Sequence, residues 1–143
     1  MAQEKKQKVL IIEDDVPLID LYDKKFTAKG YEVIRAVDGV KGVEAAEESL
    51  PDAIVLDLML PVMNGFEVLK KLKKNDKTRR IPIVILSNYG ETPNITEGLL
   101  SGAAEYLIKV EHTPEEVVDV VDDIIVEKES LIGKAFKETE SSK

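Results

Sequence analysis

One carboxylate stands alone in a long apolar run of this 143-residue chain. Asp57 is the only ionisable group in AIVLDLMLPVMNG, residues 53–65. Three other polar groups also come directly after short apolar runs: the acidic trio Glu13-Asp14-Asp15, the hydroxyl of Ser87 and the ammonium of Lys109. Together they offer carboxylates, one hydroxyl and one cation, which is a set of groups able to do chemistry if the fold brings them together.

The chemistry of this set is that of phosphoryl transfer. Converging carboxylates repel one another unless a cation is present, and ligands that are all oxygen suit a hard divalent ion, so Mg²⁺ is expected. An aspartate beside such an ion is a competent nucleophile toward phosphorus. Lys109 adds a second cation, and the Ser87 hydroxyl can donate a hydrogen bond to a phosphoryl oxygen. The set predicts that Asp57 is a phosphoryl acceptor.

The elements before these groups alternate strictly along the chain. Runs rich in β-branched residues have the length of buried strands, and the segments between them have helical spacing. The strands are expected at residues 9–12, 31–36, 53–56, 81–86 and 105–108. The helices are expected at residues 16–29, 39–49, 65–74 and 92–101, with a fifth beginning at the Thr113-Pro114 cap. In the first helix we expect the buried face to hold Leu18, Leu21, Tyr22 and Phe26. The pattern predicts an α/β fold, a five-stranded parallel sheet with helices on both faces.

Such a sheet gathers the carboxyl ends of its strands at one edge, where sites form. Four of the five expected strands end in a polar group of the set above. Asp15 has a simpler role, because it precedes Pro17 in the first turn of a helix and is expected to cap that helix. The acidic trio, Asp57, Ser87 and Lys109 should therefore meet at one edge of the sheet.

Composition sets limits on the class of protein. The chain has no cysteine, which excludes disulfides, thiolate metal sites and cysteine catalysis. Its net charge of −8 argues against a general nucleic-acid surface, and the basic segment 70–80 is interpreted as the solvated end of a helix. No apolar run approaches the length of a membrane span, and the charged start MAQEKKQK does not resemble a signal peptide. We expect a cytoplasmic protein.

Four motifs, in order, resemble the receiver domain of bacterial two-component response regulators, in its single-domain, chemotaxis-regulator-like form. They are KVLIIEDD, IVLDLMLPVMNG, IPIVILSN and GAAEYLIKV. The resemblance covers residues 8–127, leaving a charged extension at 1–7 and a helical extension or linker stub at 128–143. It implies a flavodoxin-like fold with strand order 2-1-3-4-5.

The resemblance also implies a role for each matching residue. Asp57 corresponds to the phosphorylated aspartate, Lys109 to the site lysine, Ser87 to the switch hydroxyl and Tyr106 to the switch aromatic. The Mg²⁺ ligands would be Asp14 directly, Glu13 through water, Asp57, and the backbone carbonyl of Met59.

Three positions depart from the family pattern. Val110 stands where a proline usually follows the lysine in a cis peptide, so this bond is either trans or strained. Asn88 stands where a small residue usually follows the switch hydroxyl, and could narrow the pocket. Met59 and Tyr89 flank the path of attacking water and cannot act as general bases, which predicts a long-lived aspartyl phosphate.

We therefore expect a phosphorylation-switched signalling module and not an enzyme beyond its own phosphotransfer and slow dephosphorylation. Its partners would be a sensor histidine kinase or phosphotransfer protein and a downstream protein that binds the face made by the fourth helix, fifth strand and fifth helix. It would bind no nucleic acid or membrane directly, and would be a monomer or a phosphorylation-dependent dimer. Two alternatives stay open: a docking module of the same fold that does not use phosphate, and a hydrolase with an aspartyl nucleophile, which Met59 in place of a second aspartate disfavours.

Overall fold

The computed structural model describes the backbone of residues 6–141 and the side chains of residues 6–133. Strands and helices alternate along the chain, as predicted. The strands are β1 (Lys8–Ile12), β2 (Glu32–Ala36), β3 (Ala53–Leu56), β4 (Ile83–Ser87) and β5 (Glu105–Ile108). The helices are α1 (Val16–Ala28), α2 (Gly39–Ser49), α3 (Gly65–Lys74), α4 (Thr92–Leu100) and α5 (Pro114–Ser141), and a short 3-10 helix, Lys109–Glu111, follows β5.

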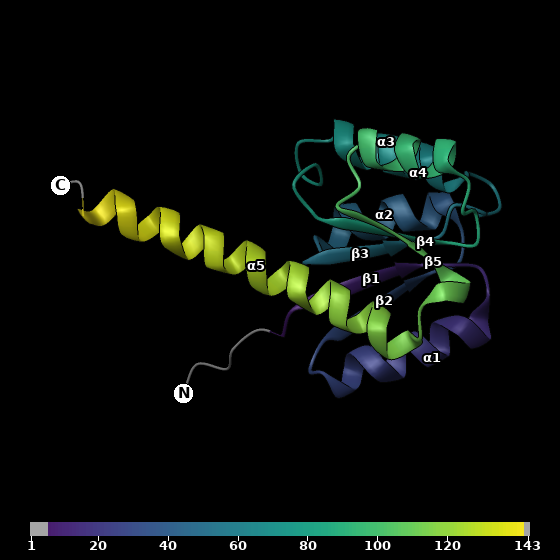
Figure 1. Ribbon diagram of the computed structural model, residues 1–143, viewed down its shortest axis with the longest axis horizontal. Coiled ribbons are helices and arrows are strands. Elements are labelled where there is room, and N and C mark those ends of the chain that lie inside the picture. Colours follow the sequence, from purple (N-terminus) through teal and green to yellow (C-terminus); the bar gives the residue numbers. More distant parts are fainter. Residues whose placement is uncertain (1–5, 142–143) are drawn as a thin grey trace.

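The five strands form one parallel sheet in the order β2-β1-β3-β4-β5, which confirms the predicted fold. Helices α1 and α5 cover one face of the sheet, and α2, α3 and α4 cover the other (Figure 1). Because both faces are covered, β1, β3 and β4 are buried almost throughout. The register places Ile12 beside Leu56, so β1 and β3 deliver the residues that follow them to the same edge.

One detail of the predicted core is wrong. The buried residues of α1 are Ile19, Tyr22 and Phe26, whereas Leu21 is 41% exposed. Residues 19, 22 and 26 follow the three-and-four spacing of a single helical face. Leu21, two residues after Ile19, is turned by about 200° at 100° per residue and lies on the far side.

Helix α5 is longer than a domain of this kind needs. It begins at the Thr113 cap, where the Thr113 hydroxyl accepts a hydrogen bond from the backbone N–H of Glu116 at 3.2 Å. It then continues without a break to Ser141 and projects beyond the body of the domain (Figure 1). The C-terminal segment, expected as a helical extension or linker stub, is thus helical as far as residue 141. It contains one aromatic residue, Phe136, whose side chain lies outside the described residues. Within the described part of the chain, no helix has both the length and the apolar character needed to cross a bilayer.

The loop between β3 and α3 contains a strained residue. Val62 has φ of +69° and is 82% exposed. A β-branched side chain in this left-handed region costs on the order of 1–2 kcal/mol relative to the ordinary right-handed conformation. Because Val62 is exposed, little packing offsets that cost.

We expect Val62→Asn to raise the free energy of unfolding by about 1 kcal/mol, since asparagine tolerates the left-handed region. Urea denaturation of the two proteins measures the difference. Val110→Asn is the matched control, because Val110 is 83% exposed and has a negative φ; it should change stability by less than about 0.5 kcal/mol. An equal response of both positions would show that polarity, and not backbone strain, is responsible.

Candidate functional site

Asp57 lies immediately after β3 and is 7% exposed. Its backbone N–H donates to the carbonyl of Ile12 at 3.0 Å, and its Oδ1 accepts a hydrogen bond from the backbone N–H of Met59 at 3.2 Å. The start of α3 packs closely against it, because a Cβ on Gly65 would collide with the Asp57 carbonyl oxygen and the Leu58 Cα. The carboxylate is therefore held in one place by its own strand, loop and neighbouring helix.

The three acidic residues that follow β1 lie in three different environments. Glu13 is 4% exposed, and its Oε2 accepts from the backbone N–H groups of Asp14 at 2.9 Å and Asp15 at 3.3 Å. Asp14 is exposed at the edge of the sheet. Asp15 accepts from the backbone N–H of Leu18 at 3.2 Å and caps α1, as predicted. Glu13 and Asp14 are thus the two members of the trio left to face Asp57.

Lys109 joins the two buried carboxylates. Its Nζ donates to Glu13 Oε1 and lies 3.3 Å from Asp57 Oδ2. The peptide bonds of the described residues are all trans, so of the two alternatives for Lys109-Val110 the structure has the trans bond, at the start of the 3-10 helix. The lysine reaches both carboxylates from this backbone.

The electrostatics of this cluster are dominated by burial and by one cation. Burial raises the pKa of Glu13, and the Lys109 ammonium offsets only part of this effect. Burial alone would lower the pKa of Lys109, but the hydrogen bond to Glu13 and the charge of Asp57 outweigh it, so that this pKa is raised. Ligand oxygens of Glu13, Asp14 and Asp57 lie within 4.8 Å of one another. Lys109 contacts only Glu13 and Asp57 of these three carboxylates, so the cluster keeps an excess of negative charge, and its oxygens fit a hard divalent cation.

Ser87 and Tyr106 both hold the backbone of Tyr89. The Ser87 hydroxyl, 1% exposed, accepts from the Tyr89 N–H at 3.1 Å, and the Tyr106 hydroxyl donates to the Tyr89 carbonyl. Tyr106 is 8% exposed, and this burial raises its pKa. The loop after β4 is therefore held by hydrogen bonds to the Ser87 hydroxyl at the end of β4 and to the Tyr106 hydroxyl on β5.

Helix α4 makes room for the inward ring of Tyr106 at Gly98. A Cβ there would lie 2.7 Å from Ile85 Cδ1 and 3.1 Å from Tyr106 Cδ2. We expect Gly98→Ala to lower the free energy of unfolding by about 1–3 kcal/mol through overpacking. In urea denaturation, Ile85→Val should restore part of the loss in the double variant, because it removes the closest atom. If the losses of stability in the two single variants simply added in the double variant, the space at Gly98 would not be what accommodates Ile85 and Tyr106.

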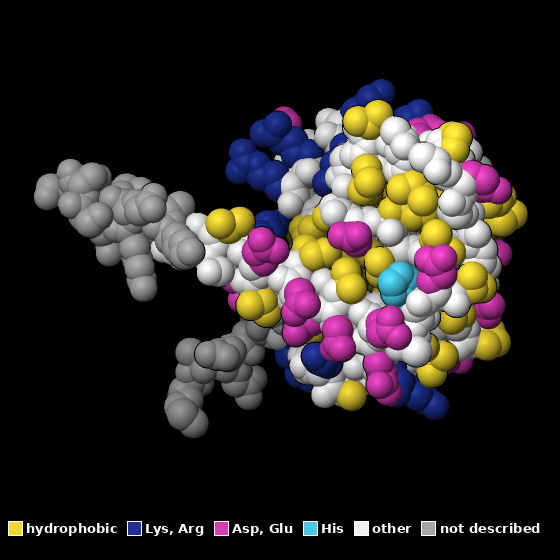
Figure 2. Space-filling view, viewed as in Figure 1, with side chains coloured by type: hydrophobic (Ala, Val, Ile, Leu, Met, Phe, Trp, Pro, Cys, Tyr) yellow, Lys and Arg dark blue, Asp and Glu magenta, His cyan; other side chains and the backbone are white. Residues whose placement is uncertain are grey.

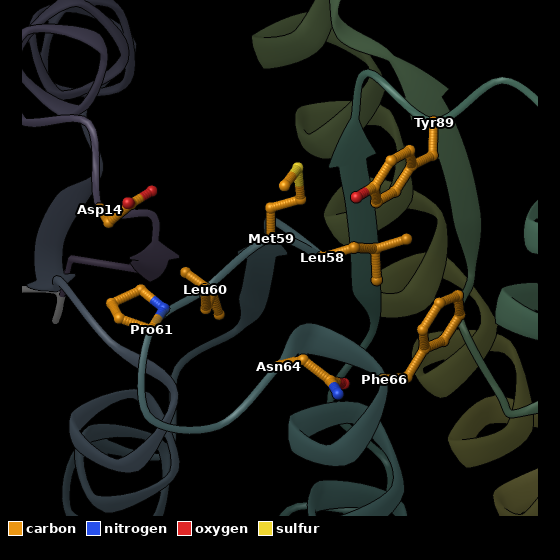
Figure 3. Close-up of a pocket in the computed structure, with 8 residues that line it drawn as sticks. All are labelled: Asp14, Leu58, Met59, Leu60, Pro61, Asn64, Phe66 and Tyr89. Carbon is orange, nitrogen blue, oxygen red and sulfur yellow. The ribbon is translucent and has the colours of Figure 1, made fainter.

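A cleft of about 490 Å³ opens beside the carboxylate cluster. Asp14 lies at one side, Tyr89 and Phe66 at the other, and Met59 between them (Figure 3). Apart from Asp14 and Asn64, the lining is apolar or aromatic. Asn88, expected to narrow the site, is exposed and does not line this cleft. Phe66 was not predicted, because nothing in the sequence separates the exposed side of a helix start from the rim of a cleft.

Residues 9–122 match the model of a family described as the response regulator receiver domain. The chain belongs to this family. The receiver domain thus spans most of the chain, and receiver domains take part in phosphorylation-regulated signalling with histidine kinases or phosphotransfer proteins and bind Mg²⁺ at an acidic pocket.

Curated relatives of this receiver domain are longer proteins. It is 41% identical over 102 residues to the DNA-binding dual master transcriptional regulator RpaA of Synechocystis, covering 71% of this chain and 42% of that protein. It is 39% identical to the response regulator PleD of Caulobacter vibrioides, again over 71% of this chain but 22% of that protein. The chain therefore spans less than half the length of these two relatives.

Solved structures agree with the fold. The Francisella response regulator 1452 receiver domain is 31% identical with a TM-score of 0.79, covering 86% of this chain and 99% of that one. The chemotaxis response regulator CheY4 of Vibrio cholerae is 28% identical with a TM-score of 0.77, over 84% and 99%. The receiver domain of the sensor kinase PA1611 of Pseudomonas aeruginosa, 26% identical with a TM-score of 0.76 over 85% and 98%, has a magnesium ion coordinated in its active-site cleft.

Proposed function

We propose that this receiver domain accepts a phosphoryl group from a histidine kinase or phosphotransfer protein onto Asp57 and thereby changes its partner-binding surface. The observation that carries the proposal is the Lys109 ammonium between the buried carboxylates of Glu13 and Asp57, with Asp14 exposed beside them. A structural ion pair would need only one carboxylate for one lysine. Three carboxylates at the ends of two neighbouring strands suit a site that receives further positive charge and a phosphoryl group.

Mg²⁺ would be held by Asp14, by Asp57, by the backbone carbonyl of Met59, and by Glu13 through water. When bound, the ion would neutralise charge on the carboxylate and on the incoming phosphoryl oxygens. Glu13 is suited to an indirect role, because its two oxygens already accept hydrogen bonds from Lys109 and from backbone N–H groups. Asp14 is exposed and keeps its carboxylate available.

In the transfer step, an Asp57 carboxylate oxygen forms the new bond to phosphorus. The bond between phosphorus and the donor's imidazole nitrogen breaks, and its electron pair stays on that nitrogen. Lys109 is placed to stabilise charge on a phosphoryl oxygen, and the Ser87 hydroxyl to donate to another once it turns from Tyr89. This rotation of the Ser87 hydroxyl would release one of the two hydrogen bonds that hold the backbone of Tyr89, the other coming from Tyr106. A change at the acceptor would in this way reach the face made by α4, β5 and α5.

The output would be protein contact through the face made by α4, β5 and α5. We assign residues 8–127 to the receiver domain, 1–7 to a charged extension and 128–143 to a C-terminal extension, which is helical as far as Ser141. A cytoplasmic location, expected from the sequence, fits the family.

The test is the intact mass of the protein after incubation with acetyl phosphate and Mg²⁺. We expect a gain of one phosphoryl group that disappears when Mg²⁺ is removed and in Asp57→Asn. Asp52→Asn is the control: Asp52 lies at the opposite edge of the sheet, where its carboxylate accepts from the backbone N–H of Lys8 at 2.7 Å. A gain that survives in Asp57→Asn would refute the acceptor role. No gain from acetyl phosphate or from purified histidine kinases would favour a docking module that works without phosphate.

A further inference from the structure

The part of α5 whose last described side chain is at residue 133 lies beside a concentration of positive charge (Figure 2). Residues 70–80 contain seven of the chain's 20 Lys and Arg but only one of its 28 Asp and Glu. The exposed cations at the end of α3 and in the loop before β4 form what we call the basic patch: Lys70, Lys71, Lys74, Lys77, Arg79 and Arg80.

The loop that carries the second half of the basic patch is held firmly. The half-buried Lys73 ammonium donates to the carbonyls of Arg79 and Ile81, both at 3.0 Å, and Lys128 of α5 donates to the carbonyl of Arg80 at 2.9 Å. Thr78 is fully buried. The helix dipole accounts for cations in the last turn of α3, but not for the three that follow the helix. The expected solvated helix end therefore explains only part of this patch.

Few carboxylates neutralise the basic patch. Among the side chains of residues 6–133, its ion pairs are Lys70 with Glu97 at 3.9 Å and Arg79 with Asp76 at 3.6 Å, both exposed. The remaining four cations of the patch have no described carboxylate within 4.0 Å. A surface of this kind favours an anionic partner.

The helix beside the patch presents apolar side chains. Leu131 is 61% exposed and Ile132 62% exposed, and they lie two turns after Ile124 and Ile125, which pack in the core. They therefore continue the core-facing side of α5 past the end of the core. Gly133 lowers the helix propensity of this segment, and a helical segment without packing is marginal in water. Because Lys128 joins α5 to the loop at Arg80, the patch and this helix face adjoin. We call them together the corner, with the patch as its basic wall and Leu131 and Ile132 as its apolar wall.

We propose that the α5 helix of a second copy of this chain fills the corner, in a two-fold dimer with the two helices antiparallel. The occupant must offer apolar and acidic side chains together, and α5 does so. Asp123, Glu127 and Leu131 follow one another at four-residue spacing and so form one stripe, and both carboxylates are exposed and unpaired within residues 6–133.

Antiparallel pairing centred near Lys128 places this stripe of one copy against the basic patch of the other. The same contact is made twice, as two-fold symmetry requires. A nucleic acid would satisfy the patch but would leave Leu131 and Ile132 exposed, so the combination of the two walls favours α5. The contact does not involve the Asp57 site and stands independently of the proposed function.

Sedimentation equilibrium of the 143-residue wild-type protein and of two double variants tests this dimer. Lys77→Glu/Arg80→Glu reverses charge on the patch, and Asp123→Lys/Glu127→Lys reverses it on the stripe. We expect the wild type to dimerise, less tightly at high salt, and each variant to dimerise about tenfold or more weakly. An equimolar mixture of the two variants should form a heterodimer, because each reversed surface then meets its complement.

Lys24→Glu/Lys41→Glu is the matched control for the patch variant, since it lowers the net charge by the same amount at exposed lysines outside the corner; it should dimerise as the wild type does. Circular dichroism verifies that each variant is folded, and the salt dependence of the wild type needs no variant. A monomeric wild type at high protein concentration and low salt would overturn the proposal. So would a dimer that neither double variant weakens, a mixture of variants that stays monomeric, or a monomer that binds a DNA duplex through the patch.

Discussion

Lys109→Met should slow phosphorylation of Asp57 by about 100-fold or more and lower the free energy of unfolding by about 2–3 kcal/mol. The lysine is the cation for two carboxylates that are each less than 10% exposed. Removing it leaves both without their partner, and removes the charge that would stabilise the phosphoryl oxygens. Intact mass over time measures the rate, and urea denaturation without metal measures stability.

The stability loss in Lys109→Met should depend on pH. The raised pKa of Lys109 keeps its ion pairs intact at neutral pH, and they are lost only as pH rises through that pKa, in the alkaline range. The raised pKa of Glu13 means that this group takes up a proton on acidification before an ordinary glutamate does, which relieves its charge. The difference between wild type and variant should therefore shrink as pH falls from neutral. Lys41→Met, at an exposed lysine, is the control; a variant as stable as this control at neutral pH would contradict the role of Lys109.

The aspartyl phosphate should be long-lived, and Met59→Asn or Tyr89→Glu should each shorten its lifetime by about tenfold, less than the roughly 100-fold or more that a fully positioned general acid or base contributes. Both side chains line the cleft beside the acceptor (Figure 3). Neither can take a proton from water or orient it strongly in the wild type. Loss of the phosphoryl group after removal of the phosphodonor, followed by mass, gives the lifetime.

Met59→Leu and Tyr89→Phe keep the cleft apolar and should leave the lifetime within about twofold of the wild type. This pair of controls separates the polarity of the cleft from its shape. If the two polar variants also kept the wild-type lifetime, water access through this cleft would not be what limits hydrolysis.

The parallel sheet and the edge where its polar groups meet could be predicted from the pattern, because the strands are short, β-branched and bounded by turns. The strand order followed only from the resemblance to receiver domains. The arrangement of groups within that edge was less accessible. That Lys109 reaches both Glu13 and Asp57 depends on a trans backbone that the sequence left open.

Two further features depend on three-dimensional context. Leu21 is exposed and Ile19 is buried because of the way α1 is rotated on the sheet. Apolar spacing alone does not fix this rotation, because leucine or isoleucine occurs on both faces of the helix. The left-handed backbone at Val62 has no signal in the sequence, because the residue type argues against it.

Because α5 is one continuous helix, a small tilt at its start becomes a large displacement at its far end. It starts five residues after Lys109, at the edge of the sheet where the carboxylates gather, and runs as one helix of 28 residues to a point beyond the body of the domain. At 1.5 Å per residue it is about 42 Å long, so a tilt of about 5° at its start would displace its far end by about 4 Å. A shift at the acceptor edge too small to alter the core would thus become, at the other end of this helix, a movement as large as a side chain.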